Sequence, residues 1–584
     1  MNCNICERCC EIKEGGVGAC KMYTNRNNEI VERFPDSYLV AFPISIETMP
    51  VLHFYPKGKF LQIGTVGCNF KCNGCISEIL VKQVGAASRV LVEMKPDVVV
   101  GKAIADNCIG IAFFINDPTV SYFTFKNLAA ASKDSDLLVG CSTNAYFTET
   151  ALRELIPYLD FVNIGLKGYS DRMYRSCGVQ SSKPVLRNLK LLYDGNVHVE
   201  VAVVHMKGFE EEVMNSARYV SSISEDIPFQ IMRFIPFGEA DIDFEPTIRE
   251  SEILCDGVKN YLDNVYLFNS PGTDYLNTIC PECGKNVFKR DFYGPMGART
   301  TENTLDGVCE CGYKIPFVGT ISGEQFEEEG FFGGYRYTRA LEMIHAILAA
   351  LKVDDETIGK IWFDIIRSDY LREFHEKIQK IDSYLGIIRY FAEYSSKEGE
   401  GEELIGYIKK RVNLIASKLK EADKPGVYYA MGYPLFALNG ERFENDLVEA
   451  SGGESVNRLI EREGKPGINI SKDEFIKLNP EIAFISGFLS CPVSDFYEYC
   501  MKHELDVDAV KKKNIYRIPP GWDFGSPQWI LGLMYIANRI HPEIFCFDME
   551  KEADEFYRTF YGVEFSSMKP NRAWSFYEHS AEKG

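Results

Sequence analysis

The sequence has little positive charge and no long uninterrupted apolar run. Its 64 Lys and Arg are outnumbered by 84 Asp and Glu, which gives a formal net charge of −20 at pH 7. Non-specific nucleic-acid binding needs a basic surface, so we expect no nucleic-acid partner. No apolar run approaches the roughly 20 residues that cross a bilayer. The first residues, MNCNICERCC, lack the apolar core of a secretory signal. The sequence thus predicts a cytoplasmic protein without a membrane span.

Cysteine, by contrast, is plentiful: the chain has 19 among its 584 residues, most of them in tight groups. Because no export signal is visible, these groups predict metal sites in a reducing cytoplasm rather than disulfides. A hydrophobic fraction of 46% and a charged fraction of 25% are typical of a globular protein. A chain of this length is expected to form three or four domains.

One stretch, residues 59–80, combines a strand pattern with three cysteines. Its apolar start predicts a buried strand, and the glycines that follow predict a loop. The loop carries Cys68, Cys72 and Cys75 with the spacing C-x3-C-x2-C. A structural zinc takes four ligands, whereas three thiolates on a four-iron cluster leave one iron open for chemistry. A zinc knuckle that borrows a distant ligand is the alternative, and the spacing favours the cluster.

The motif GTVGCNFKCNGC resembles the cluster loop of the radical S-adenosylmethionine (SAM) enzymes. The stretch 53–75 is similar to the branch that contains pyruvate formate-lyase-activating enzyme and the AmmeMemoRadiSam proteins. The resemblance implies that SAM chelates the open iron of a 4Fe-4S cluster. An electron then cleaves SAM to methionine and a 5′-deoxyadenosyl radical, which takes a hydrogen atom from a substrate. It also implies oxygen sensitivity, and an electron donor such as ferredoxin or flavodoxin.

Apolar strands alternate with helical patterns after this loop, which predicts an α/β fold with a parallel sheet. The arrangement fits the partial (β/α)6 barrel of radical SAM enzymes, with the site at the carboxyl ends of the strands. The strand candidates are residues 60–65, 110–115, 136–141, 161–166, 197–204 and 229–235. The helix candidates between them are residues 148–158, 185–193 and 210–222.

The resemblance assigns SAM-site candidates to positions on or after these strands. They are Asn116, Asp117, Thr143, Asn144, Lys167, Glu200 and Arg233. The segment 116–119 also indicates a helix start. Gly165 stands where the family has an Asp two residues before its Lys, and Gln230 replaces a family His. We expect Glu200 to hold the ribose hydroxyls if its strand faces the barrel interior, and to face solvent otherwise. Arg233 is a candidate for a SAM or substrate carboxylate, with a surface Arg as the alternative.

Two further cysteine groups predict accessory metal sites. The first, at the N-terminus, resembles the cysteine-rich leader of the AmmeMemoRadiSam branch, and zinc and an iron–sulfur cluster both fit it. Its four ligands would be Cys3, Cys6, Cys10 and Cys20, with Cys9 spare. The second is a four-thiolate ribbon for zinc or iron, structural by default and an electron relay in the alternative. Its ligands would be Cys280, Cys283, Cys309 and Cys311.

The second half of the chain differs in kind. Helical patterns dominate up to about residue 420, and an α/β region then begins. That region resembles the C-terminal lobe of class III (iron-siderophore/cobalamin type) substrate-binding proteins. The resemblance rests on short phrases in the right order: KPGVY at 424–428, NDLVEASGG at 445–453, LNPEI at 478–482, AVK at 509–511 and HPEIF at 541–545. We expect the loop 431–436 of this lobe to approach the open end of the barrel and present a ligand to it.

The predicted domains are 1–58 (cysteine-rich segment), 59–270 (barrel), 271–320 (four-cysteine metal ribbon), 321–423 (helical region) and 424–584 (binding-protein-like lobe). Three functions compete. The enzyme could modify a small or metal-containing cofactor presented by the lobe. It could instead activate a protein partner by forming a glycyl radical, or be a non-catalytic protein that delivers a metal or cluster. The fusion to a binding lobe favours the first.

Overall fold

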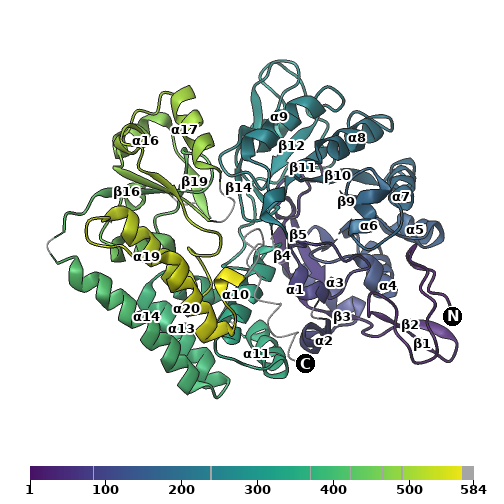
Figure 1. Ribbon diagram of the computed structural model, residues 1–584. Helices are drawn as coiled ribbons and strands as arrows, with labels where there is room; N and C mark the ends of the chain where they lie inside the picture. The colour runs from purple at the N-terminus through teal and green to yellow at the C-terminus, as the bar shows by residue number, and fades with distance from the viewer. Residues whose placement is uncertain are drawn as a thin grey trace.

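The computed structural model describes residues 1–82, 84–236, 240–368, 370–420, 422–462, 466–487 and 491–567. Its first half is built on an eight-stranded sheet (Figure 1). In sheet order the strands are β12 (Val265–Phe268), β11 (Phe229–Arg233), β10 (His198–His205), β9 (Phe161–Leu166), β8 (Leu138–Thr143), β7 (Gly110–Phe113), β5 (Lys59–Gly64) and β4 (Val40–Ser45). All neighbours from β5 to β12 are parallel, and β4 is antiparallel to β5. The predicted α/β fold is therefore confirmed.

Helices connect the parallel strands. They are α3 (Pro96–Ala105), α4 (Tyr122–Lys133), α5 (Glu149–Leu155), α6 (Asp171–Ser176), α7 (Lys183–Asp194), α8 (Glu210–Ser221) and α9 (Ile248–Val258). In α7 the buried residues include Val185, Leu189 and Leu192, which recur at the spacing of one helix face. Because each crossover buries such a face on the sheet, the strands present their carboxyl ends at one common rim.

The sheet has two strands that the sequence analysis did not predict, β4 and β12. β4 lies within the segment 1–58, which we expected to precede the barrel, so the sheet begins before residue 59. This strand contains Pro43, which cannot donate a ladder hydrogen bond and is tolerated because β4 is an edge strand. β12 is only four residues long and adds a seventh parallel strand at the opposite edge.

Two small sheets flank the barrel. Near the N-terminus, β1 (Tyr23–Arg26) and β2 (Glu29–Glu32) form an antiparallel hairpin. The metal ribbon contains β13 (Thr278–Ile279), β14 (Asn286–Phe292) and β15 (Ala298–Asn303), and encloses a small core of its own. A fully buried ion pair joins this ribbon to the segment after β4, with Arg290 Nε 3.3 Å from Glu47 Oε1.

The second half forms a helical layer followed by a mixed sheet, at the left of Figure 1. The helices are α10 (Arg336–Ala350), α11 (Asp355–Arg367), α12 (Tyr370–Lys377), α13 (Ile381–Tyr394) and α14 (Glu398–Lys418). The sheet order is β19 (Gly467–Asn469), β17 (Phe436–Leu438), β16 (Gly426–Ala430), β20 (Ile482–Ile485) and β21 (Ile515–Arg517), with β18 (Glu454–Ser455) paired to β16. The helices around this sheet are α15 (Phe443–Ala450), α16 (Lys472–Leu478), α17 (Val493–Lys502), α18 (Asp508–Lys511), α19 (Trp529–Ile540) and α20 (Met549–Tyr561).

The lobe touches the barrel at the rim where the carboxyl ends of β11 and β12 lie. The backbone N–H of Tyr433 lies 3.5 Å from the carbonyl oxygen of Pro271, and its hydroxyl donates to Glu252 at 3.2 Å. Pro271 follows β12, and Glu252 belongs to α9, which follows β11. The loop 431–436 thus packs on the segments that follow these two strands, the side of the barrel on which we expected it. No helix in the described ranges is both long and apolar enough to span a membrane.

The buried ion pair between Arg290 and Glu47 gives a stability prediction. Arg290→Met would leave the Glu47 carboxylate buried without its cation, and among the described residues the Thr300 hydroxyl at 2.7 Å would remain as its donor. Breaking such a pair typically costs about 3–5 kcal/mol. We expect a clear fall in the melting temperature by circular dichroism. The double variant Arg290→Met/Glu47→Gln should recover much of the loss; an unchanged melting temperature for the single variant would contradict this role.

Candidate functional site

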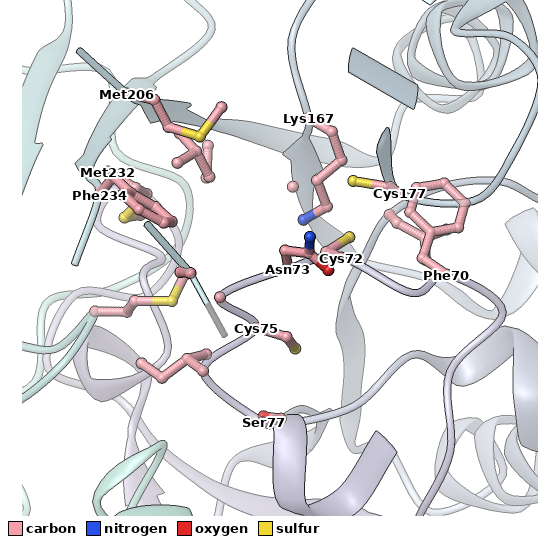
Figure 2. Close-up of a pocket in the computed structure, with 18 of the residues that line it drawn as sticks. Phe70, Cys72, Asn73, Cys75, Ser77, Lys167, Cys177, Met206, Met232 and Phe234 are labelled. Carbon is pink, nitrogen blue, oxygen red and sulfur yellow. The ribbon is translucent and has the colours of Figure 1, made fainter. Parts of the chain in front are cut away.

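A cavity of about 510 Å³ opens at the carboxyl ends of the barrel strands (Figure 2). Its walls come from the loop after β5, from the ends of β7 to β11, and from Tyr335 of the helical region. The predicted site residues that line it are Cys68, Cys72, Cys75, Asn116, Asp117, Thr143, Asn144, Lys167 and Arg233. Residues that lie far apart in the sequence are therefore brought to one place by the parallel strands.

The loop that carries the three cysteines depends on two glycines in the left-handed region. Gly67 has φ +82° and Gly74 has φ +72°. A Cβ atom on Gly74 would lie 2.9 Å from side-chain atoms of Phe234 and Ala240, so the loop also needs the missing side chain. This permits the tight turn between Cys72 and Cys75.

The amide of Asn116 holds the start of this loop. Its Oδ1 accepts from the Thr65 N–H at 2.9 Å, and its Nδ2 donates to the carbonyl oxygens of Val66 and Gly67 at 3.3 and 3.2 Å. One side chain therefore satisfies three backbone groups that would otherwise be buried without partners. Asn116 positions the cysteines as well as lining the cavity.

Asp117 joins two of the strand ends. Its carboxylate accepts from the Asn144 N–H at 2.7 Å and from the Thr143 hydroxyl at 3.1 Å. It also caps the short helix η3 (Pro118–Ser121) by accepting from the Thr119 N–H at 3.0 Å. The helix start that the sequence suggested is therefore present together with the placement at the cavity. Burial raises the pKa of Asp117, and these hydrogen bonds oppose that shift.

Two polar groups lie close to the cysteines. Asn144 donates from Nδ2 to Asn69 Oδ1 at 2.6 Å, and its Nδ2 lies 3.8 Å from the Cys68 sulfur. Lys167 extends toward Cys72 (Figure 2). A Cβ atom on Gly165 would lie 3.4 Å from its Nζ, so the space of the family's Asp is occupied in part by the lysine amine. Because Gly165 replaces that Asp, Lys167 has no carboxylate at this position to pair with, and its amine extends toward the sulfur of Cys72.

The thiols are packed so that they resist ionisation without a metal. Burial raises the pKa of Cys75 to about 11, and it raises that of Cys68 as well. Burial lowers the pKa of Lys167, whereas the surrounding cysteines raise it, and the net shift is upward, so the amine stays charged. Metal ligands must be deprotonated, so metal binding here releases protons and is favoured by the Lys167 charge.

Arg233, at the end of β11, is buried and only partly satisfied. Its Nε donates to the Asn269 carbonyl oxygen at 2.9 Å, and its Nη1 pairs with Glu245 at 2.9 Å. Its Nη2 is buried with no hydrogen-bond partner among the described residues. The alternative of a surface arginine is wrong, because the side chain is fully buried at the cavity wall.

Glu200 requires a correction, because it does not line the cavity. Its carboxylate accepts from the backbone N–H groups of Leu52 and His53, at 2.9 and 2.7 Å, and from Gln230 at 2.7 Å. It points inside the barrel, but it is only the third residue of β10, whereas the cavity lies at the carboxyl end. Leu52 packs with Ala202 of β10 and Met232 of β11, which line the cavity. These apolar side chains lie between Glu200 and the cavity. The side chain faces the barrel interior, as one alternative expected, but it lies near the start of β10 and not at the carboxyl end where the cavity is.

Cys177 lines the cavity although no sequence pattern singled it out. It follows α6, its carbonyl oxygen accepts from the Lys71 N–H at 2.9 Å, and its thiol lies beside that of Cys72. This contact lowers the pKa of Cys177 to about 7 and raises that of Cys72. A lone cysteine far along the chain from the motif matches no ligand spacing, so only the fold reveals this fourth thiol.

The ribbon cysteines form a separate site. The sulfur atoms of Cys280 and Cys311 are 3.6 Å apart, and those of Cys283 and Cys309 are 3.4 Å apart. All four ligand atoms lie within 4.8 Å of one another. A tetrahedral ion with metal–sulfur bonds of about 2.3 Å places its sulfurs ~3.8 Å apart, so the group fits a single ion.

The four ribbon cysteines lie at the opposite end of the barrel from the cavity, although Met296, in the turn between β14 and β15, lines the cavity. The charges of Asp263 and Asp226 contribute to a raised pKa of Tyr313, and these residues come just before β12 and β11. Val318 bridges to Phe54, next to the His53 backbone that Glu200 holds. A route for electrons from the ribbon would cross the whole barrel, so the position favours a structural metal over the relay alternative.

Removing two of the ribbon cysteines tests how many metal atoms this site holds. Cys280→Ser/Cys311→Ser is expected to lose one metal ion per chain, because the four sulfurs enclose room for one. Elemental analysis of iron, zinc and acid-labile sulfide measures this. A loss of several iron atoms together with sulfide would show a cluster instead. The Cys68→Ala variant serves as the matched control, since it should leave this ion in place.

Parts of the chain are similar to known proteins. The model of the radical SAM superfamily matches residues 63–220. An uncharacterised protein of Methanocaldococcus jannaschii is 28% identical over 326 residues, which are 54% of this chain and 96% of that protein. Solved structures also match. A periplasmic solute-binding protein of Veillonella parvula has a TM-score of 0.28 and 22% identity, with 32% of this chain and 59% of that one covered. CeuE of Helicobacter pylori with Ni(II) bound has a TM-score of 0.29 and 21% identity, with 32% of this chain and 61% of that one covered. This chain thus spans about three-fifths of each. Residues 63–220 therefore form a radical SAM domain.

Proposed function

We propose that this enzyme cleaves SAM reductively at a 4Fe-4S cluster held by Cys68, Cys72 and Cys75, and that the resulting radical abstracts hydrogen from a small or metal-containing cofactor. The observation that carries the proposal is the convergence of these three cysteines with Asn144 and Lys167 on one cavity. When bound, the cluster supplies the electron that breaks a carbon–sulfur bond of SAM. Three protein thiolates leave one iron free for that ligand.

The residues present fit both groups. The three thiols face the cavity and supply the cluster ligands. The buried Nη2 of Arg233 lacks a partner among the described atoms, and leaving such a donor unsatisfied costs about 1–3 kcal/mol or more. A carboxylate of SAM or of the substrate would satisfy it. A volume of about 510 Å³ is in the range of small-molecule sites.

The far wall of the cavity suits a carbon-centred radical. Met206, Met232 and Phe234 lie across the cavity from Lys167 and Cys72 (Figure 2). These side chains exclude water and offer no strongly acidic or basic group. The substrate therefore places an apolar portion here, with any charged portion toward Arg233. In the described part of the chain, no observation favours activation of a glycine-bearing partner protein.

The C-terminal lobe is linked to the cavity wall through charges. Glu245 lies between Arg233, 2.9 Å from its Nη1, and Arg517 of β21, 3.4 Å from its Nη2. No described residue from the lobe lines the cavity itself. We propose that the lobe delivers or retains the cofactor substrate at the rim, and that Glu245 adjusts the position of Arg233 when it does so.

The decisive experiment is anaerobic. The protein is reconstituted with iron and sulfide and given SAM and dithionite, and 5′-deoxyadenosine is measured. We expect product from the wild type and none from the Cys68/Cys72/Cys75→Ala variant. Absence of product from wild-type protein whose iron content shows the cluster would overturn the proposal, or restrict it to a reaction that requires bound substrate. Adding candidate cofactors to the same assay separates these outcomes.

The corrected role of Glu200 gives a second test. Glu200→Gln removes the carboxylate that accepts two backbone N–H groups, so the free energy of unfolding should fall by about 1–3 kcal/mol. Because Glu200 does not reach the cavity, 5′-deoxyadenosine formation per folded molecule should stay close to wild type. Melting curves and the product assay are run on the same samples. Loss of SAM binding by a fully folded variant would restore the ribose assignment.

A further inference from the structure

The cysteine-rich N-terminal segment lies against the outside of the cluster loop. The guanidinium of Arg8 donates to the carbonyl oxygen of Asn69. On the other side of Cys68, a Cβ atom placed on Gly67 would lie 3.2 Å from the carbonyl oxygen of Cys20. Both chain neighbours of Cys68 therefore lie beside this segment.

Within the segment the cysteines lie near one another, and Cys6 interacts with Cys3, Cys10 and Cys20, the other three ligands that the sequence predicts. The Cys3 N–H donates to the Cys10 carbonyl oxygen at 2.9 Å, which closes the loop between them. Burial raises the pKa of Cys6 to about 12, and the charges of the other three add to the shift. Cys9 is different: it is exposed, and its thiol points at the Cys6 carbonyl oxygen.

These thiols are spread more widely than a single ion requires. The ribbon sulfurs lie within 4.8 Å of one another, and in the described part of the chain no other group of three such residues does. The catalytic cysteines share this wider spread. A 4Fe-4S cluster binds each of four thiolates to a different iron, so its cysteines stand further apart than those around one ion. The wider spread of the N-terminal thiols therefore favours such a cluster over a single zinc ion.

The segment is also shut out of the catalytic cavity. No described residue before Cys68 lines it. A group held there cannot contact SAM or substrate directly. It does reach the surface, because Cys10 and Cys20 are half-buried and their neighbours Glu11 and Ala19 are exposed. The site therefore has one side toward solvent and the other toward the cluster loop.

We propose that Cys3, Cys6, Cys10 and Cys20 hold an iron–sulfur cluster that relays electrons to the group bound by Cys68, Cys72 and Cys75. This rests on the proposed function. One electron leaves a low-potential one-electron carrier protein, which is oxidised. It passes through the N-terminal site, which returns to its oxidised state, and ends at the catalytic site, where it is consumed in SAM cleavage. No proton or atom is transferred along this route.

The test compares Cys6→Ser/Cys20→Ser with the matched control Cys9→Ser, both as full-length, anaerobically reconstituted protein. We expect the double variant to lose one of two clusters, about half of the cluster iron and sulfide, and the electron paramagnetic resonance signal that does not respond to SAM. Cys9→Ser should keep both signals. Zinc in place of iron at the N-terminal site of the wild type would overturn the proposal.

The relay itself is tested with two reductants. A reduced ferredoxin should reduce the catalytic cluster of the wild type in a fast phase, and the double variant should lose that phase. Dithionite, a small ion, should support 5′-deoxyadenosine formation in both. If ferredoxin reduces both proteins equally fast, the relay is wrong. If dithionite gives no product even with the wild type, the proposed function fails instead, and the two failures are distinct.

A rapid-freeze experiment on the wild type covers the case in which the double variant does not fold. After mixing with reduced ferredoxin, the signal that is insensitive to SAM should appear before the SAM-sensitive one. The reverse order would show that electrons reach the catalytic site by another route. This measurement needs no substitution, so it decides the question on the protein as it exists.

Discussion

The side chain of Asn116 is the constraint on which the site depends. Its amide bonds to the backbone of Thr65, Val66 and Gly67 and so fixes the direction in which the chain leaves β5. Three cysteines in eight residues could bind a metal in many conformations. What gives them one orientation is the anchoring of the loop to the end of β7, together with the left-handed turns at Gly67 and Gly74. The open side of the three thiols then faces the cavity and not the core.

The barrel separates its two metal-type sites by the length of its strands. The ribbon cysteines lie at their amino ends and the cysteine loop at their carboxyl ends, with a polar layer around Glu200 and a hydrophobic layer around Leu52 in between. This separation favours the structural role that we expected for the ribbon metal. The N-terminal segment, by contrast, lies beside both neighbours of Cys68, and its Arg8 donates to the Asn69 carbonyl oxygen.

The order of the strands and much of the cavity wall could be predicted from the sequence, because apolar runs mark buried parallel strands and their carboxyl ends must meet. Depth along a strand could not be predicted. Glu200 and Lys167 both follow the alternation of inward-facing residues, but one is near the start of its strand and the other just after the end. The position of Cys177 at the cavity was not predicted, because its partner Cys72 is distant in sequence. β4 was not predicted, because Pro43 interrupts the strand pattern of this edge strand.

The central claim is that SAM binds an iron which the protein leaves open. Mössbauer spectroscopy of protein reconstituted with ⁵⁷Fe, recorded with and without SAM, tests it most directly. The account predicts that a single iron of the cluster held by Cys68, Cys72 and Cys75 changes its spectrum toward higher coordination when SAM is added. A spectrum that SAM leaves unchanged, in protein shown to carry that cluster, would contradict it.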